Sequence, residues 1–337
     1  MWDQKQLEQL AQVIPSWYQK GHRSLPWRED KEPYHIWLSE IMLQQTRVEA
    51  VKGYYNRFLE KLPTIEALAK ADEEVLHKLW EGLGYYSRVR NLKKAAIQIM
   101  DQHGGQFPTD HDQILRLPGI GAYTAGAVAS IAFDQKTPAV DGNVLRVMAR
   151  LGADERPVDT PAYKKEVSDV LTLVYPENAG DFTQGLMELG ATLCGPDKAP
   201  QCDICPCAEF CKGKHMASKL PVRLPKRQRR REERTVLILS CAGKLAFSKR
   251  PAEGLLADLW EFPNYPGFMD AGQALEQLEK EGLHPVEIYK QVHKKHIFTH
   301  IQWDLRGIYI EVCEPGGPYQ WFGEDQPALP TAFRLFL

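Results

Sequence analysis

The spacing of apolar residues changes once along this chain, and that change limits the fold to two joined domains of different class. From residue 5 to about residue 193 apolar residues return every three or four positions, as in NLKKAAIQIMDQH, which is the period of an α-helix. After residue 233, TVLILSC, KLAFSKR and HIQWDLRGIYIEV read as strands, and AGQALEQLEKEGL reads as a helix. A chain of 337 residues is long enough for two domains. We therefore expect a multidomain protein, all-α first and a smaller α+β domain second.

A basic segment punctuated by prolines, KLPVRLPKRQRRREER, separates the two patterns. It holds eight Lys or Arg and two Glu, a composition typical of an exposed linker. Two roles fit it: a solvated tether, and a strap that contacts nucleic-acid phosphates. The predicted boundaries are a helical domain at 1–216, a linker at 217–232 and the second domain at 233–337.

Composition and charge exclude several classes of protein. The 43% hydrophobic and 26% charged residues are those of a globular chain and argue against general disorder. No apolar run approaches the about 18 residues of a membrane span, and MWDQKQLEQL lacks the pattern of a signal peptide. We therefore expect a cytoplasmic protein with no membrane partner. A net charge of −2 leaves nucleic-acid binding open, because an average can hide a basic face.

The stretch LPGIGAYTAGAV places Gly119 and Gly121 directly before a helical pattern. Glycines there permit a tight turn and leave backbone N–H groups at the helix start free of side chains. These groups, together with the helix dipole, form an anion site that suits a nucleic-acid phosphate. A plain helix–helix turn is the alternative interpretation.

Two carboxyl groups lie in contexts that suit catalysis. Glu40 falls in IWLSEIMLQQT, an amphipathic helical pattern with Trp37 and Ile41 beside it, and burial there would raise the pKa of the carboxyl and favour its acid form. Asp141 precedes Gly142 and Asn143, a position typical of a helix N-cap. An aspartate can cap a helix and face a substrate at the same time.

The seven cysteines are unevenly placed, and five of them lie between residues 194 and 211. In a reducing cytosol such a cluster indicates a metal site before disulfides. Four thiolates at short spacing bind either zinc or a [4Fe–4S] cluster. The five are Cys194, Cys202, Cys205, Cys207 and Cys211.

Together these motifs resemble the helix-hairpin-helix DNA glycosylases, a superfamily that includes endonuclease III, and within it the adenine DNA glycosylases of the MutY type. LPGIGAYTAGAV is similar to the hairpin (117–121) and TPAVDGNV to the segment of the catalytic aspartate. LPWRED, PYHIWLSEIMLQQTRVEAV, GLGYYSRVRNL and the cysteines follow in the family's order, and GLLADLWEFPNYPG resembles the start of a Nudix fold. The resemblance covers nearly the whole chain. It implies a bacterial base excision repair enzyme, nucleoid-associated when bound to DNA, that acts as a monomer on duplex DNA with adenine opposite 8-oxoguanine or guanine.

The resemblance also implies roles for four catalytic residues. Glu40 would protonate the adenine ring and later help to activate water, while an ionised Asp141 would stabilise the cationic sugar, either electrostatically or as a covalent partner. Asn143 would help to hold the catalytic groups in place. Tyr123 stands where strand-cutting relatives carry a lysine that forms a Schiff base, which implies a monofunctional glycosylase.

Further positions match residues that read the DNA. Gln45 and Tyr85 resemble the family residues that wedge and stack in the opened duplex. Arg28 and Gln184 fall at adenine-contacting positions, and a glutamine amide suits the N6 and N7 edge of adenine. Gly119 and Gly121 would hold the DNA backbone.

The second domain resembles a recognition module. The Nudix metal-binding helix is missing, since NYPGFMDAGQALEQLEKEG stands in its place, and pyrophosphate cleavage is not expected. In the family a Phe-Ser-His loop senses 8-oxoguanine, and this chain has Phe298, Thr299 and His300 there. Threonine keeps the hydroxyl and adds a methyl group.

By resemblance the cysteines hold a [4Fe–4S] cluster in the loop 194–211. The family pattern is Cys-x6-Cys-x2-Cys-x5-Cys; Cys202, Cys205 and Cys211 match it, and Cys194 lies one residue further away. A loop with Gly and Pro can absorb one residue, so Cys194 is the expected first ligand, with Cys207 as the alternative and zinc as the alternative metal. The cluster would order a basic loop, with Lys212 and Lys214, against the DNA backbone.

Three rival functions follow from the same motifs. An endonuclease III-like lyase acting on damaged pyrimidines is disfavoured by Tyr123 and by the added domain. A Nudix pyrophosphatase is disfavoured by the missing metal-binding helix. A non-catalytic iron–sulfur protein that binds DNA is the third alternative.

Overall fold

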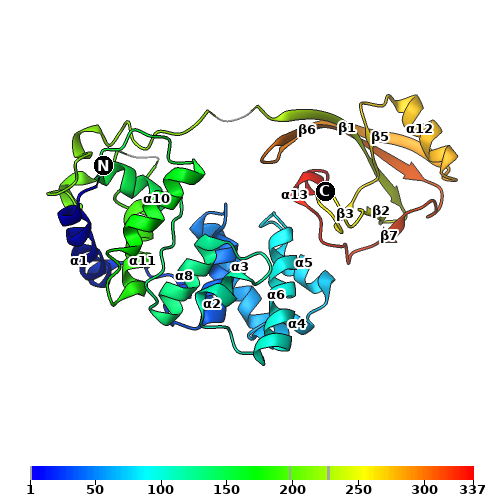
Figure 1. Cartoon of the computed structure of the whole chain (residues 1–337). Coiled ribbons are helices and arrows are strands. Elements are labelled where there is room, and N and C mark those ends of the chain that lie inside the picture. Colours follow the sequence, from blue (N-terminus) through cyan, green and yellow to red (C-terminus); the bar gives the residue numbers. More distant parts are fainter. Residues whose placement is uncertain (1, 197–198, 226–227) are drawn as a thin grey trace. The chain divides into compact units, whose positions relative to one another are not determined.

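The computed structural model describes residues 2–196, 199–225 and 228–337 (Figure 1). Residues 197–198 of the predicted cluster loop, residues 226–227 of the predicted linker and residue 1 lie outside the described residues. The chain divides into two compact units. The first comprises Met1–Ala71 and Arg90–Pro225, and the second comprises Asp72–Val89 and Lys226–Leu337.

The first unit is helical, as its apolar period predicts. Its helices are α1 (Gln4–Gly21), α2 (Pro33–Leu43), α3 (Val48–Lys61), α4 (Ile65–Lys70), most of α6 (Ser87–His103), α7 (His111–Leu115), α8 (Ala122–Phe133), α9 (Gly142–Leu151), α10 (Pro161–Thr172) and α11 (Ala179–Ala191), with 3-10 turns η1 (Pro26–Arg28), η2 (Cys202–Ile204) and η3 (Lys214–Met216). No helix within the described ranges is long and apolar enough to cross a membrane.

Helix α11 is the centre of the packing in this unit. It lies against α1, α8 and α9, and α2 packs on the other side of α8 (Figure 1). The core between these helices includes Leu10, Ile14, Met148, Phe182 and Leu186, each almost fully buried. Burial of this apolar area, at about 25 cal/mol per Å², holds α1, α9 and α11 together. The predicted catalytic residues stand on α2, α8 and α9.

Two local features set the backbone near those residues. Gly119 has φ 78°, a left-handed conformation that favours glycine, and it ends the turn before α8. A Cβ atom at Gly126 would lie 2.1 Å from the carbonyl oxygen of Pro138, so only glycine lets the segment before α9 pack directly on α8. That segment ends at Asp141, the N-cap of α9.

The second unit is built on a seven-stranded mixed sheet of order β3-β2-β1-β6-β5, with β4 paired to β1 and β7 to β2. The strands are β1 (Arg230–Cys241), β2 (Lys244–Lys249), β3 (Trp260–Glu261), β4 (Asn264–Pro266), β5 (Pro285–Ile297), β6 (Ile301–Val312) and β7 (Gln320–Phe322). Strands β1 and β6 run parallel, in register from Arg230 opposite Ile301 to Ser240 opposite Glu311. Strands β5 and β6 form an antiparallel hairpin.

Apolar clusters cover both faces of this sheet. Helix α12 (Ala271–Lys280) packs on one face through Ala274 and Leu278, and α13 (Thr331–Arg334) packs on the other through Phe333. Helix α5 (Glu73–Trp80) belongs to the same unit. An all-α part and an α+β part are both present, which confirms the predicted fold class.

Three details differ from the sequence prediction. Strand β1 begins at Arg230, inside the predicted linker 217–232, because its first residues pair with Ile301 and its successors. The segment 72–89, expected in the helical domain, groups with the second unit. Strand β5 was not predicted, because KQVHKKHI carries polar side chains on both faces of an edge strand.

Candidate active site

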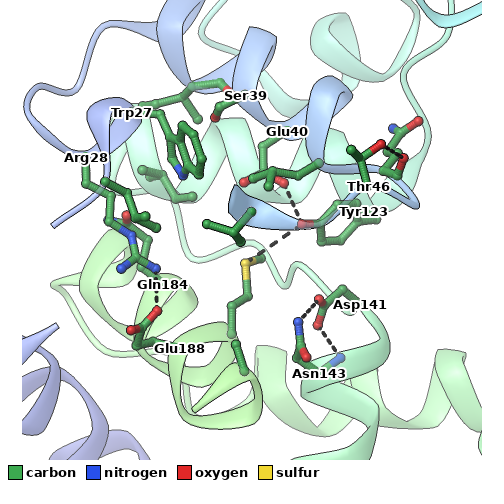
Figure 2. A pocket seen from close by; sticks show the side chains of 18 of the residues that line it. Trp27, Arg28, Ser39, Glu40, Thr46, Tyr123, Asp141, Asn143, Gln184 and Glu188 are labelled. Atoms are coloured by element: carbon green, nitrogen blue, oxygen red, sulfur yellow. Dashed lines mark hydrogen bonds and ion pairs between the residues drawn. The ribbon is translucent and has the colours of Figure 1, made fainter. Parts of the chain in front are cut away.

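A cavity of about 340 Å³ opens in the first unit among α2, α8, α11 and the start of α9 (Figure 2). It gathers all four predicted catalytic residues and three of the predicted DNA-contacting residues, which are otherwise scattered over the sequence. Its lining includes Trp27, Arg28, Ser39, Glu40, Gln45, Tyr123, Asp141, Asn143, Gln184, Met187 and Glu188.

Glu40 projects from α2 into this cavity and is 6% exposed. The Oη of Tyr123 donates a hydrogen bond of 2.5 Å to its Oε2. Burial raises the pKa of Glu40 to about 7; the Tyr123 hydrogen bond opposes that shift, the charge of Asp141 adds to it, and the charge of Arg28 opposes it. A carboxyl group that holds a proton near neutral pH is suited to be a general acid.

Helix α2 itself differs from the prediction in one respect. It is buried at Tyr34 and from Ile36 to Met42, so it has no solvated polar face and is not amphipathic. An amphipathic helix would expose a polar face, but Ser39 and Glu40 lie inside the protein with their apolar neighbours. Both are buried, which strengthens the desolvation of Glu40.

Asp141 caps α9, as its position before Gly142 predicts. Its Oδ1 accepts hydrogen bonds of 2.8 Å from the backbone N–H groups of Asn143 and Val144. Its Oδ2 accepts one of 2.7 Å from Asn143 Nδ2. Burial raises the pKa of Asp141, and these three hydrogen bonds oppose the shift by stabilising the ionised carboxylate.

Two buried arginines on α9 connect this aspartate to the cysteine loop. Arg146 Nη2 donates to Asn143 Oδ1 at 2.7 Å and to the carbonyl oxygen of Gly190 at 2.5 Å. Arg146 Nε donates to the carbonyl oxygen of Cys194 at 2.8 Å. Arg150 Nη1 reaches the same carbonyl at 2.9 Å and the Cys194 Sγ at 3.2 Å. Asn143 is predicted to hold the catalytic groups in place, and Arg146 fixes the Asn143 side chain.

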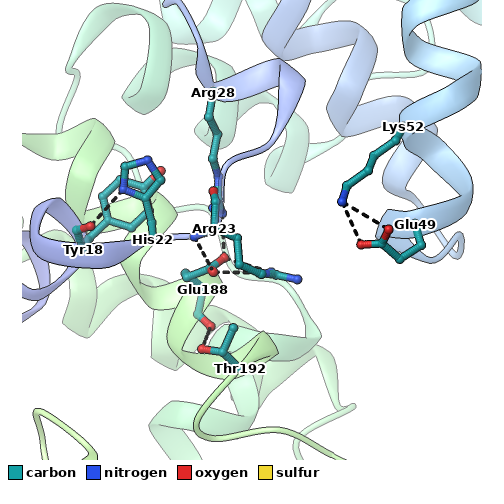
Figure 3. Close-up of polar contacts among 8 residues, drawn as sticks. All are labelled: Tyr18, His22, Arg23, Arg28, Glu49, Lys52, Glu188 and Thr192. Carbon is teal, nitrogen blue, oxygen red and sulfur yellow. Dashed lines mark hydrogen bonds and ion pairs between the residues drawn. The ribbon is translucent and has the colours of Figure 1, made fainter.

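The other end of the cavity contains charged groups that the sequence did not single out, apart from Arg28 (Figure 3). Glu188 on α11 is 2% exposed and accepts from Arg23 Nε at 2.7 Å and from Arg28 Nη2 at 2.8 Å. Figure 2 shows Arg28, Gln184 and Glu188 together, away from Glu40 and Asp141. The two predicted base-contacting residues therefore share one end of the pocket.

The two predicted wedge and stacking residues have unusual backbone conformations. Gln45 has φ 56° and Tyr85 has φ 48°, in the left-handed region that non-glycine residues seldom adopt. Tyr85 is 46% exposed, and its hydroxyl lies 3.0 Å from Thr299 Oγ1 within the second unit. Backbone conformations of this kind cluster at active sites and ligand-binding segments.

The predicted hairpin forms the turn between α7 and α8. Gly121 is the N-cap of α8, and no side chain caps the first turn of the helix there. A Cβ atom at Gly119 would lie 2.6 Å from Asn91 Cβ. The first-turn N–H groups are therefore available to an external acceptor such as a phosphate.

The cysteine loop gathers four of its five thiols around one small pocket. Cys194, Cys202, Cys205 and Cys211 line it, and Arg150 lies beside them. Cys207 is 3% exposed and packs in the core with Leu189 and its neighbours. In the described ranges, no three His, Cys, Asp or Glu side chains are close enough to hold a metal ion. Lys212 pairs with Asp3 at 2.9 Å, and Lys214 with Asp203 at 3.8 Å.

Phe298, Thr299 and His300 form the tip of the β5–β6 hairpin. Phe298 N–H donates to the carbonyl oxygen of Ile301 at 2.8 Å, and its ring packs edge-on against Trp303 at 4.9 Å between centroids. Thr299 and His300 are exposed. The phenylalanine anchors the tip, and Thr299 and His300 stay accessible there.

Sequence reasoning missed Arg23, Arg146, Arg150 and Glu188. One signal was present for the last, because a glutamate inside the apolar run GLMELGATLC is unusual and buried acids are normally paired. Its partners lie 160 and 165 residues away in the chain, so no local pattern identifies them.

Comparison with known proteins agrees with this architecture. A model for an HhH-GPD superfamily base excision DNA repair protein matches residues 38–171, and a NUDIX domain model matches 234–337. An adenine DNA glycosylase of Rattus norvegicus is 35% identical, over 85% of this chain and 67% of its own. One of Buchnera aphidicola subsp. Baizongia pistaciae (strain Bp) is 32% identical, over 95% and 93%. The structure of a thermostable thymine-DNA glycosylase superposes with a TM-score of 0.56 and 29% identity, over 63% of this chain and 97% of that one.

Proposed function

The chain belongs to the adenine DNA glycosylase family, and from that premise we propose that its pocket hydrolyses the N-glycosidic bond of adenine paired with 8-oxoguanine or guanine in duplex DNA. The observation that carries the proposal is a pair of carboxyl groups in one cavity, the buried Glu40 and the half-buried Asp141. Glu40 accepts one hydrogen bond, from Tyr123, whereas Asp141 accepts three. Breaking this bond requires a proton for the leaving base and a stabilised sugar cation.

The two carboxyl groups divide this work. Glu40, with its pKa of about 7, donates its proton to a ring nitrogen of adenine as the bond electrons pass to the base. Asp141 faces the oxocarbenium-like sugar as an anion. Water then adds to the anomeric carbon and its proton returns to Glu40, which restores the acid form. Tyr123 orients Glu40, and Asn143 orients Asp141.

The side chains that line the pocket predict hydrolysis without strand cleavage. Tyr123 occupies the position next to Glu40, and no described residue lining the cavity is a lysine. A phenol cannot form an imine with the sugar. The expected product is an intact strand with an abasic site.

Other residues would extrude and read the adenine. Gln45 and Tyr85, with their left-handed backbones, would fill and stack in the space that the flipped nucleotide leaves. Arg28 and Gln184 would contact the adenine edge. The hairpin of Gly119 and Gly121 would hold a phosphate at the start of α8.

Recognition of the opposite base would fall to the second unit. Thr299 and His300 at the β5–β6 tip carry a hydroxyl and an imidazole that can hydrogen-bond to 8-oxoguanine. The hydrogen bond between Tyr85 and Thr299 supports a joint role, because the ring that would stack lies next to the hydroxyl that would contact 8-oxoguanine.

A [4Fe–4S] cluster fits the cysteine loop. Four thiols surround one pocket, and the fifth, Cys207, is used by the apolar core. The proposed ligands are therefore Cys194, Cys202, Cys205 and Cys211, with the extra residue in the first spacing accommodated by the loop. When bound, the cluster supplies structural order to this loop. The chain's own contribution is Arg150, which donates to the Cys194 sulfur and carbonyl.

The direct test is a single-turnover assay on a duplex with one adenine opposite 8-oxoguanine, divided into samples with and without alkali. We expect cleavage of the adenine strand only after alkali, and no product from a duplex with adenine opposite thymine. Cleavage without alkali would restore the lyase alternative. Absence of any abasic product would remove the enzymatic proposal and leave a DNA-binding protein.

A further inference from the structure

Glu188 is the most completely paired carboxylate in the cavity, and none of the roles above uses it. Its side chain is 2% exposed. Oε1 accepts from Arg23 Nε at 2.7 Å and from the Arg23 backbone N–H at 3.2 Å. Oε2 accepts from Arg23 Nη2 and Arg28 Nη2, both at 2.8 Å (Figure 3).

Four donors fill the lone pairs of this carboxylate. An ionised carboxyl group offers about four acceptor sites, so Glu188 has none left for a base. Burial alone would raise the pKa of Glu188, but the hydrogen bonds and charges of Arg23 and Arg28 outweigh it and lower the pKa to about 2. Glu188 is therefore a fixed anion that acts through the two arginines and does not contact the substrate.

Arg28 is held on three sides by these contacts. Its Nη2 donates to Glu188, its Nη1 donates to the Arg23 carbonyl oxygen at 3.1 Å, and its guanidinium carbon lies 5.4 Å from the centre of the Tyr18 ring. A guanidinium has five donors, and this arrangement leaves others for a ligand in the cavity. A charged side chain held in one rotamer recognises a flat base better than a mobile one.

The same carboxylate controls the charge at this end of the pocket. The groups that act on Glu40 are Tyr123 from α8, Asp141 from the start of α9 and Arg28 from η1, and the positive charge of Arg28 favours loss of the Glu40 proton. Glu188 on α11 neutralises one of two arginine charges. Without it, the field of two unbalanced cations would work against the acid form of Glu40.

We propose that Glu188 is a positioning residue that fixes the guanidinium of Arg28 for the extruded adenine and offsets the arginine charges, so that Glu40 keeps the proton it must donate. This inference rests on the proposed function of the pocket. It gives the ion cluster of Arg23, Glu188 and Arg28 a part in the recognition of the adenine base.

Charge substitutions of opposite sign test the inference. In Glu188→Gln the net positive charge rises, and we expect the alkaline limb of the excision rate to move to lower pH by about half a unit, with a ~10-fold loss at pH 7.5. In Arg23→Gln the net positive charge falls, and the limb should move to higher pH. The double variant should return the limb close to that of wild type. Glu188→Asp keeps the charge and shortens the reach, so it should lose rate without moving the limb.

The matched control is Glu177→Gln, which removes an exposed partner of Lys136 and should match wild type. All variants are the full chain, measured in single turnover on adenine opposite 8-oxoguanine, with thermal melts to establish that each is folded. If Glu188→Gln and Arg23→Gln shift the limb in the same direction, or neither shifts it, the inference is overturned while wild-type excision still supports the proposed function. No excision by folded wild-type protein would overturn both.

Discussion

Two buried glutamates line the same cavity and have opposite protonation behaviour. Glu40 is 6% exposed and Glu188 2% exposed, yet the pKa of Glu40 is raised to about 7 and that of Glu188 is lowered to about 2. Glu40 has a tyrosine donor and a neighbouring aspartate, whereas Glu188 has two arginines. Burial is common to both, so the partners decide which glutamate carries a proton at neutral pH.

The difference shows how one pocket can contain both an acid and a permanent anion. The charge of Asp141 adds to the desolvation of Glu40, so a neutral form is favoured there. At Glu188 four charge-assisted or backbone hydrogen bonds outweigh the same desolvation. The proposed chemistry depends on keeping these two environments separate.

The largest expected effect comes from removing the acid. Glu40→Gln should reduce single-turnover excision at least ~1000-fold, because an amide cannot donate a carboxyl proton to adenine. Affinity for the mispaired duplex should change little, since Tyr123 can still donate to the amide oxygen and the packing is kept. Excision within a few-fold of wild type would contradict the role of Glu40.

The second largest expected effect is a loss of stability when Glu188 is replaced. Glu188→Gln should lower the free energy of unfolding by about 3 kcal/mol, because it removes the buried anionic partner of Arg28, whose side chain is 9% exposed, and of the more exposed Arg23. Urea unfolding of this variant and of Glu177→Gln, a surface control expected to change by less than about 1 kcal/mol, measures the difference. Equal stability of the two variants would mean that the ion cluster contributes nothing to the fold.

The two glutamates should also give opposite dependence of stability on pH. Glu188 has a lowered pKa, so its contribution is present above about pH 4.3, the unfolded value, and is lost as pH falls toward 2. Glu40 has a raised pKa, so its contribution is complete below about pH 4.3 and is lost as pH rises through 7. Relative to wild type, Glu40→Gln should therefore gain stability between pH 4 and 8, while the deficit of Glu188→Gln should shrink between pH 4 and 2. Unfolding measured at pH 3, 4, 6 and 8 tests both slopes, and parallel curves for all three proteins would contradict the pKa assignments.

The smallest effect concerns the tyrosine that connects the acid to α8. Tyr123→Phe removes the donor that opposes the raised pKa of Glu40, so the alkaline limb of excision should move to higher pH by up to about one unit. We expect a loss of rate of about 10-fold or less at pH 7, since the phenyl ring keeps the packing. An unmoved limb would show that the hydrogen bond does not control the protonation of Glu40.

Much of the fold and of the candidate site could be predicted from the sequence wherever a local pattern of residues determines the structure. The change of apolar period between residues 193 and 233 predicted the two parts, and the glycine turn and Asp141 predicted the starts of α8 and α9. Strands β1 and β6 could be predicted because the second half of β1 is apolar and β6 alternates between apolar and polar residues. Strand β5 was not, because an edge strand exposed on both faces has no apolar period.

The ion cluster shows why other residues of the site could not be predicted from the sequence. Arg23, Arg28 and Glu188 meet only through the packing of α1, η1 and α11, and nothing in their neighbours along the chain pairs them. The same holds for Arg146, which joins Asn143 to the cysteine loop across the fold. Sequence motifs locate the residues that the chemistry requires. The groups that orient those residues come together only in the folded protein, so no motif identifies them.

Glu40 as the general acid is tested by the single-turnover excision rate of the wild-type protein between pH 5 and 9.5, on adenine opposite 8-oxoguanine. With Glu40 as the acid, the rate should fall tenfold per pH unit above about pH 7, as its proton is lost. A rate that stays level or rises up to pH 9 would mean that the departing adenine takes its proton from another source, and the division of roles between the two glutamates would be wrong.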